Sequence, residues 1–194
     1  MSDVVYAGPA RHEPLAVELQ NTLYVAGGEQ IDGLATGAST RAWLSAIRDR
    51  LPLTGNAHVS REELIALRSV IRASLHALLA GHTPSRSDLH AINRASARAP
   101  QSALARWRRQ ALPVRATDVH GASASDVILA AIATDAIDLI TSSRQAGLRA
   151  CGAPGCVLLF VKDHPRREWC SAACGNRARQ ARHYARTKDR LRPT

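Results

Sequence analysis

The spacing of apolar residues over residues 1–147 predicts a helical domain. The most regular pattern keeps a helical period over about 61–80, so this helix should form the centre of the core. Ser60 with Glu63 forms a capping box at its start. Its inward positions are Leu64, Leu67, Ile71, Leu75 and Leu78. Shorter patterns predict further helices over about 15–24, 40–51, 85–99 and 127–140.

The segments between these helices carry turn or strand signals. Gly27 and Gly28 should end the first helix, with a loop through Gly33. Residues 114–119 favour a short strand, whereas 104–112 fit either a helix or irregular structure. The last of these helices should end before Gly147, which leaves only a few residues before Cys151, so the two parts of the chain should be held close together.

The last quarter of the chain has a different pattern. Strand formers occupy 157–161 and a polar turn follows at 162–165, so this segment should fold back as a β-hairpin. A helix should then carry Cys174 and three alanines on one narrow face that can lie against the hairpin: Ala178, Ala181 and Ala185. The predicted fold is therefore mainly α, with a helical N-terminal domain (1–147) followed by a small, treble-clef-like module of β-hairpin and helix (148–194).

All four cysteines of the chain lie in this module, as two close pairs. Four residues separate Cys151 from Cys156, and three separate Cys170 from Cys174. Two such pairs joined by a short arm are typical of a tetrahedral zinc site, so we expect one structural Zn²⁺ bound by all four thiolates. Two disulfides or an iron–sulfur cluster would use the same count of cysteines, and spacing alone does not exclude the cluster.

Positive charge is concentrated in the same module. The formal net charge is +10, and residues 150–194 hold ten Lys or Arg against three Asp or Glu. Several of these cations repeat at helical spacing after Cys174, which suits contact with phosphates, so we expect binding to double-stranded DNA. The candidate DNA-binding residues are Arg166, Arg167, Asn176, Arg177, Arg179, Arg182, His183, Arg186, Lys188 and Arg190.

Two groups of motifs resemble a known family. Trp169-Cys170-Ser171 followed by Cys174-Gly175-Asn176-Arg177 resembles the CGNR zinc finger, although many members have one more residue between the last two cysteines. That finger ends bacterial proteins whose N-terminal part is the ABATE domain, described as stress-induced transcription regulators. The N-terminal half is similar too: residues 15–23, then Gly28-Glu29, Asp32-Gly33-Leu34 and Trp43-Leu44 follow in the expected order.

The resemblance implies a bacterial transcription regulator whose helical domain senses a ligand or forms a homodimer. A candidate ligand pocket would use Asn21, Thr22, Arg41 and Trp43, because polar side chains beside apolar helix faces suit an effector. The alternative is a protein-interaction module that docks on RNA polymerase or another acidic surface. The two differ in whether binding needs DNA.

The remaining sequence signals bear on class and location. No phosphate-binding loop, dinucleotide fingerprint or His-Glu-x-x-His motif is present, and four thiolates leave zinc no open position, so we do not expect an enzyme. The sequence contains no signal peptide and no apolar run of membrane-spanning length, so no membrane partner is expected. Reduced cysteines then favour a cytoplasmic, nucleoid-associated protein.

Overall fold

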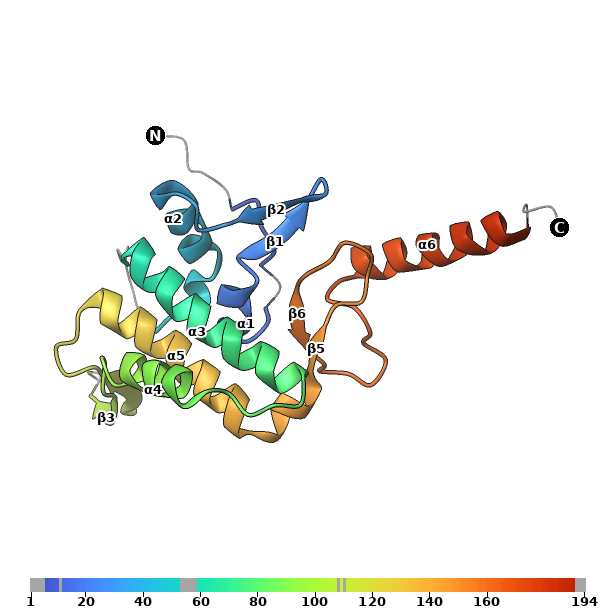
Figure 1. The fold of residues 1–194 in the computed structure, drawn as a ribbon. Helices are drawn as coiled ribbons and strands as arrows, with labels where there is room; N and C mark the ends of the chain where they lie inside the picture. The colour runs from blue at the N-terminus through green and yellow to red at the C-terminus, as the bar shows by residue number, and fades with distance from the viewer. Residues whose placement is uncertain (1–5, 11, 53–58, 108, 110, 191–194) are drawn as a thin grey trace.

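The computed structural model describes residues 6–10, 12–52, 59–107, 109 and 111–190, with the backbone alone at residues 189 and 190. Figure 1 shows a helical body, from which helix α6 extends to one side. The helices of the body are α1 (Leu15–Gln20), α2 (Gly37–Ala46), α3 (Arg61–Leu79), α4 (Arg86–Ser96) and α5 (Ala124–Thr141). None of the described helices combines the length and apolar character needed to cross a bilayer.

Local caps set the starts of the longer helices, and the cap predicted at Ser60 is present. The hydroxyls of Ser60, Ser85 and Ser123 accept hydrogen bonds from the third residue of α3, α4 and α5 respectively. α3 buries its apolar stripe at Leu64, Leu67, Ile71 and Leu75, and α5 packs beside it with α1 and α4. All six residues of α1 are buried, so this short helix lies at the centre of the body.

The first predicted helix is wrong in its second half. α1 ends at Gln20, and the chain then forms an antiparallel hairpin of β1 (Leu23–Ala26) and β2 (Glu29–Asp32). Gly27 and Gly28 make its two-residue turn, with φ of 61° and 86°. Two successive residues at positive φ suit a type I′ hairpin turn, so the glycine pair closes a hairpin instead of leading into a loop.

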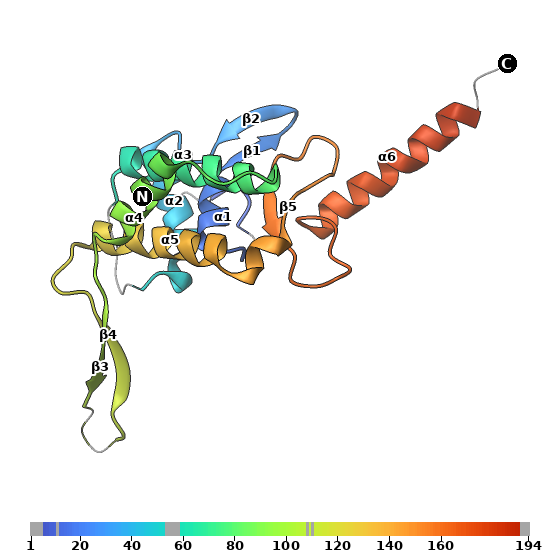
Figure 2. The same ribbon diagram turned by 60° about the horizontal axis from the view of Figure 1, so that its bottom comes forward.

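A second hairpin occupies the segment that the sequence left undecided. β3 (Ser102–Arg106) pairs with β4 (Val114–Asp118), from Ser102 opposite Asp118 to Arg106 opposite Val114. β4 confirms the short strand predicted there. Figure 2 shows the β3–β4 ribbon projecting from the helical body, at the opposite end from α6.

The C-terminal module begins after a 3-10 turn, η2 (Ser143–Gly147), and consists of β5 (Leu148–Ala150), β6 (Leu159–Val161) and α6 (Ala172–Arg190). The predicted hairpin is present, but β6 pairs with β5, which precedes the first cysteine, and not with residues beyond the turn at 162–165. Leu148, Leu159 and Val161 belong to the main core cluster. The core therefore continues across the boundary predicted at residue 147.

Helix α6 leaves the body after its first turns. Ala178 is 4% exposed and packs with the cysteines, but Ala181 and Ala185 are exposed to solvent. The prediction that the alanine face lies along the hairpin is thus correct only at Ala178. Beyond that residue every described side chain of α6 is exposed, which agrees with the projecting helix in Figures 1 and 2.

Candidate metal centre and nucleic-acid interface

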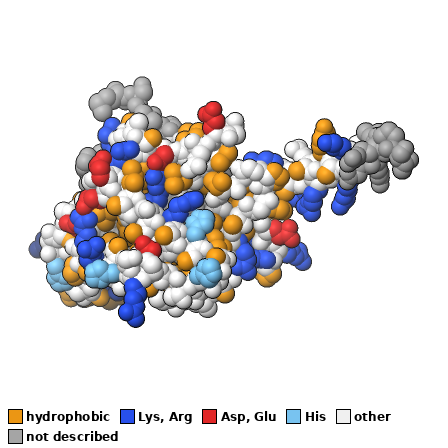
Figure 3. All heavy atoms as spheres, in the orientation of Figure 1, with side chains coloured by type: hydrophobic (Ala, Val, Ile, Leu, Met, Phe, Trp, Pro, Cys, Tyr) orange, Lys and Arg blue, Asp and Glu red, His pale blue; other side chains and the backbone are white. Residues whose placement is uncertain are grey.

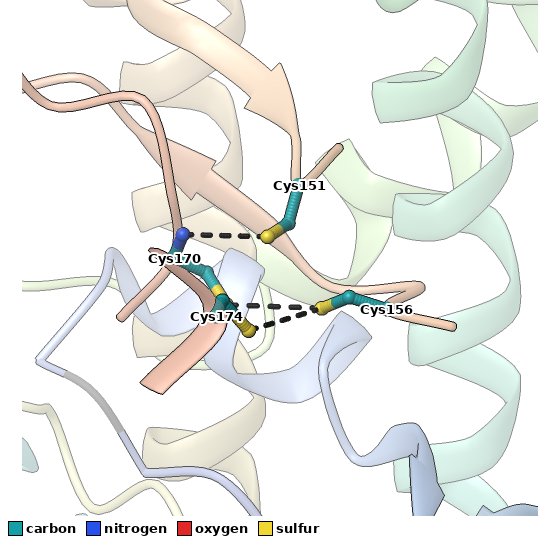
Figure 4. Close-up of side chains that lie close together, drawn as sticks. All are labelled: Cys151, Cys156, Cys170 and Cys174. Atoms are coloured by element: carbon teal, nitrogen blue, oxygen red, sulfur yellow. Dashed lines mark hydrogen bonds between the residues drawn. The ribbon is translucent and has the colours of Figure 1, made fainter. Parts of the chain in front are cut away.

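Two strands and one helix bring the cysteine side chains to one point. Cys151 follows β5, Cys156 precedes β6, Cys170 precedes α6, and Cys174 lies in the first turn of α6. Figure 4 shows the four side chains converging, and all four sulfur atoms lie within 4.8 Å of one another. The Sγ–Sγ distances are 3.8 Å from Cys156 to Cys170, 3.4 Å from Cys170 to Cys174 and 3.8 Å from Cys174 to Cys156.

These distances fit a single tetrahedral ion. Zn–S bonds of about 2.3 Å in a tetrahedron place the sulfurs roughly 3.8 Å apart. A disulfide needs about 2.05 Å between sulfurs, and all four cysteines are free. A multi-iron cluster would hold its ligand sulfurs further apart, because several metal and sulfide ions lie between them. The four cysteines therefore form the zinc site that the sequence predicts.

The pKa values of the cysteine thiols also favour a bound cation at this site. A hydrogen bond from Cys170 lowers the pKa of Cys156 to about 5, while that hydrogen bond and burial raise the pKa of Cys170. Burial likewise raises the pKa of Cys151. Crowded, buried thiols resist ionising together, and a divalent ion bound to all four removes that obstacle because metal binding displaces their protons.

One backbone donor and one side-chain donor lie next to the sulfur ligands. The Cys170 amide nitrogen lies 3.5 Å from the Cys151 sulfur, and the Arg177 guanidinium lies 3.4 Å from the Cys174 sulfur. A zinc ion with four thiolates carries a net charge of −2, so positive charge at Arg177 stabilises the centre. Arg177, the last residue of the Cys-Gly-Asn-Arg motif, thus has a structural contact at the metal centre.

The outer edge of β6 is covered by side chains from the helical domain. The Leu159 amide donates to the Asn21 carboxamide oxygen at 2.9 Å, and the Asn21 nitrogen donates back to the Leu159 carbonyl at 2.9 Å. The Val161 amide donates to the Glu13 carboxylate at 2.9 Å. Asn21 and Glu13 are 0% and 2% exposed. They satisfy a strand edge that would otherwise lack partners, and so fix the zinc module to the body.

Arg167 completes this contact and differs from the other candidate DNA-binding residues. Its guanidinium pairs with Glu13, donates to the Val161 carbonyl at 3.1 Å and lies 4.8 Å from the centre of the Phe160 ring. The ion pair with Glu13 keeps the Arg167 side chain directed toward the protein. The role of Glu13 was missed from the sequence, because its contact spans 148 residues of chain and follows no local pattern.

The other candidate DNA-binding residues lie on or near α6. Arg166 is exposed in the turn before Cys170. The Asn176 carboxamide oxygen accepts a hydrogen bond from Arg179, and the Arg182 Nε donates to the Ala178 carbonyl at 3.4 Å. The Arg190 side chain lies outside the described residues. The described side chains exposed along the projecting part of the helix include Arg179, Arg182, His183, Arg186 and Lys188.

The four candidate pocket residues differ in their exposure to solvent. Asn21, Thr22 and Trp43 are 0% exposed, whereas Arg41 is exposed on α2. Thr22 accepts a hydrogen bond from Arg68 at 2.8 Å, and Arg68 also holds both oxygens of Asp32. A hollow of about 430 Å³ in the described surface is lined by other residues: Glu63, Ala66, Leu67, Val70, Ala91, Arg94, Ala95, Arg98 and Leu129.

Comparison with protein families identifies both parts of the chain. Residues 13–143 match the ABATE family, described as "Putative stress-induced transcription regulator". The chain belongs to the ABATE family. Residues 148–187 match the CGNR zinc finger, the segment that contains the four cysteines and most of α6. Among curated proteins there was no match.

The N-terminal residues that resemble the family motifs make structural contacts in the folded protein. In this ABATE protein the Asn21-Thr22 pair has two structural tasks, because Asn21 binds the edge of β6 and Thr22 binds Arg68. Asp32 pairs with the same arginine, with Nη–O distances of 2.6 Å and 2.8 Å. Hydrogen bonds from Arg68 hold the pKa of Asp32 below its ordinary value. These motifs connect α1, β2 and α3 to the zinc module.

Proposed function

We propose that this protein regulates transcription by contacting double-stranded DNA through α6. The observation that carries the proposal is the exposed row of cations on a helix that stands clear of the body. Figure 3 shows basic side chains along the projecting helix. None of Arg179, Arg182 and Arg186 lies within ion-pair distance of an acid among the described residues. Their charge is therefore available to phosphates.

The spacing of these arginines suits a nucleic-acid groove. Arg182 is three residues after Arg179 and four before Arg186, so the three lie on one face of the helix. Arg186 comes seven residues after Arg179, which is a rise of about 10 Å along the axis at roughly 1.5 Å per residue. An α-helix fits the major groove, and arginine binds phosphate oxygens or guanine edges with two hydrogen bonds. The Asn176 contact holds Arg179 near the start of this face.

The metal centre would set the direction of the DNA-binding helix. Bound zinc supplies a fixed tetrahedral connection among its four ligands, and Cys174 is one of them in the first turn of α6. Asn21 and Glu13 connect the same module to the body. The orientation of α6 therefore follows from the core, and zinc acts as a structural element of the binding surface.

The helical domain would supply the regulatory part. We propose that it senses a small ligand or pairs with a second copy, since many regulators read two half-sites as dimers. The apolar hollow between α3, α4 and α5 supports a sensing role, because its volume of about 430 Å³ suits a small molecule. Sedimentation of the protein with and without duplex DNA would test pairing, and a monomer under both conditions would exclude it.

A second candidate is docking of α6 on an acidic protein such as RNA polymerase. The observation that favours it is the 74% exposed ring of Tyr184, with the exposed Ala181 and Ala185 nearby on the helix. An aromatic ring among cations is typical of a protein interface. Binding to polymerase without DNA, lost on Tyr184→Ala, would support this candidate and count against DNA as the partner.

The test of the first proposal is a fluorescence-anisotropy titration of zinc-loaded protein with random-sequence duplex DNA at several salt concentrations. Removing two phosphate contacts with Arg182→Ala and Arg186→Ala should lower affinity and reduce the slope of log K against log salt by about 2. The matched control is Arg48→Ala with Arg86→Ala, which removes the same charge from exposed positions on the body. Equal affinity of the two double variants would refute the role of α6.

A further inference from the structure

The β3–β4 ribbon has few contacts with the body. Its two strands pair from Ser102–Asp118 to Arg106–Val114, and most of its side chains are exposed on both faces. Figure 2 shows it extending into solvent away from α4 and α5. A two-stranded ribbon is only marginally stable by itself in water, and the usual partner is a helix or a further strand. Its exposed faces therefore suggest a binding surface.

Large apolar side chains gather at the free end of the ribbon. Trp107 is 75% exposed, Leu112 is 86% exposed and Val114 is 38% exposed. Only three other large hydrophobic residues are comparably exposed in the described chain. Solvent-exposed tryptophan is unusual unless it serves recognition, since its flat ring stacks well on bases and on other rings. The rest of the ribbon is thin, with small side chains at Ala103, Ala105, Ala116 and Thr117.

The described part of the ribbon is also basic. Arg106, Arg109 and Arg115 are exposed, and none has an acid within ion-pair distance among the described residues. The one acid on the two strands, Asp118, lies at the base, where it accepts a hydrogen bond from the His120 amide at 2.9 Å. Since Arg115 lies opposite Ala105 while Arg106 lies opposite Val114, the two arginines extend from opposite faces of the ribbon.

We propose that the β3–β4 ribbon is a second DNA-binding element, which enters a groove of the duplex with Trp107 at its leading end. This inference rests on the DNA-binding function proposed above and extends it to a second surface. A groove has phosphates along both walls, so cations on both faces of a thin ribbon match it. Apolar side chains at the tips of minor-groove proteins insert against base steps in the same way.

Other occupants fit the ribbon less well. A flat acidic protein surface would meet one face and leave the arginine of the other in solvent. A second copy of the chain would bring arginines against arginines, which repel. Duplex DNA satisfies both the two-sided charge and the aromatic end.

The binding test uses two ribbon variants and the control described for α6. Arg109→Ala with Arg115→Ala should weaken binding to random-sequence duplex by about 10-fold and reduce the salt slope by about 2. Trp107→Ala should weaken binding about 5- to 150-fold with little change in slope, because stacking involves no counterion release. Trp107→Phe should retain most of the affinity. Arg48→Ala with Arg86→Ala again controls for net charge.

A second readout follows Trp107 itself. Trp43 is fully buried and Trp169 is half-buried, so fluorescence quenched by acrylamide in the free protein comes mainly from Trp107. Duplex DNA should protect this emission, and the difference should be absent in Trp107→Phe. Circular dichroism of each variant checks that the fold is retained.

The outcomes separate this inference from the function it rests on. In one outcome the wild type binds DNA and the α6 variant loses binding, but the ribbon variants bind as the charge control does and Trp107 stays accessible to acrylamide. That outcome refutes the ribbon inference and leaves the α6 proposal standing. If the wild type does not bind DNA at all, both fall. Sedimentation showing that the ribbon variants abolish a dimer would assign the ribbon to self-association and also overturn the inference.

Discussion

The contact between Asn21 and β6 leads to a stability prediction that can be worked out from the structure. Asn21→Ala removes a carboxamide that is fully buried and holds both backbone groups of Leu159 at 2.9 Å. On its other edge β6 pairs with β5, where Ala150 lies opposite Leu159. The alanine variant would therefore leave one amide and one carbonyl of Leu159 without their protein partners inside the core.

The expected loss of stability is large. An unsatisfied buried donor or acceptor costs about 1–3 kcal/mol, so two such groups lower the free energy of unfolding by roughly 2–6 kcal/mol. Water entering the vacated space would bring the loss toward the lower end of that range. For a chain of this size about 1 kcal/mol corresponds to roughly 2–4 °C, so the melting temperature should fall by about 5–20 °C.

The assay is thermal and urea unfolding of zinc-loaded protein followed by circular dichroism. Asn93→Ala is the matched control, since Asn93 is exposed on α4 and the same atoms are removed. This control should change the melting temperature by no more than a few degrees. Zinc content should remain at one ion per chain in both variants at room temperature, because no ligand changes. If Asn21→Ala were as stable as Asn93→Ala, the idea that side chains of the helical domain cover the edge of β6 would be refuted.

Two further predictions concern the metal and acid stability. Cys170→Ser should weaken zinc binding by more than about 100-fold and lower the helical signal of α6 while α3 and α5 persist; complete loss of helix by circular dichroism would contradict this. Asp32→Asn should flatten the acid side of the stability profile. Because Arg68 depresses the folded pKa of Asp32, its contribution is present above the unfolded pKa of about 3.9 and is lost as pH falls through the folded value. Urea unfolding between about pH 3 and 6 measures this contribution. Asp49→Asn is the control, because Asp49 is exposed and any loss of stability through zinc release at low pH affects both variants equally. Stability profiles of Asp32→Asn and wild type that run parallel over this pH range would refute the prediction.

The helices and the metal ligands could be predicted because their signals are local. Each of the helices α3, α4 and α5 begins at a serine whose hydroxyl binds the third residue after it, and such caps are visible in the sequence. The two cysteine pairs close short loops at characteristic spacing. Both kinds of signal depend on residues a few positions apart, and the structure bears them out.

Two strand signals were local enough to predict, at β4 and β6, but the strand pairings and the cross-chain contacts could not be predicted for a physical reason. β5, the partner of β6, has only three residues, too few to show an alternating pattern. The β3–β4 ribbon is exposed on both faces, so nothing in its burial imposes alternation. The bonds from Glu13 and Asn21 to β6 join residues 148 and 138 positions apart, and only the folded chain brings them together.

The zinc centre and the helical core form one continuous chain of contacts that ends at α6. Leu159 and Val161 pack in the main core on one side, and β6 leads directly into the segment that ends at Cys170. Arg167 links the helical core to the zinc centre, since its guanidinium binds Glu13 and also donates to the Cys170 carbonyl at 3.4 Å. Removing zinc would leave the bonds of β6 to the body in place but would release the start of α6. The metal is therefore needed less for the fold of the body than for the fixed direction in which the basic helix leaves it.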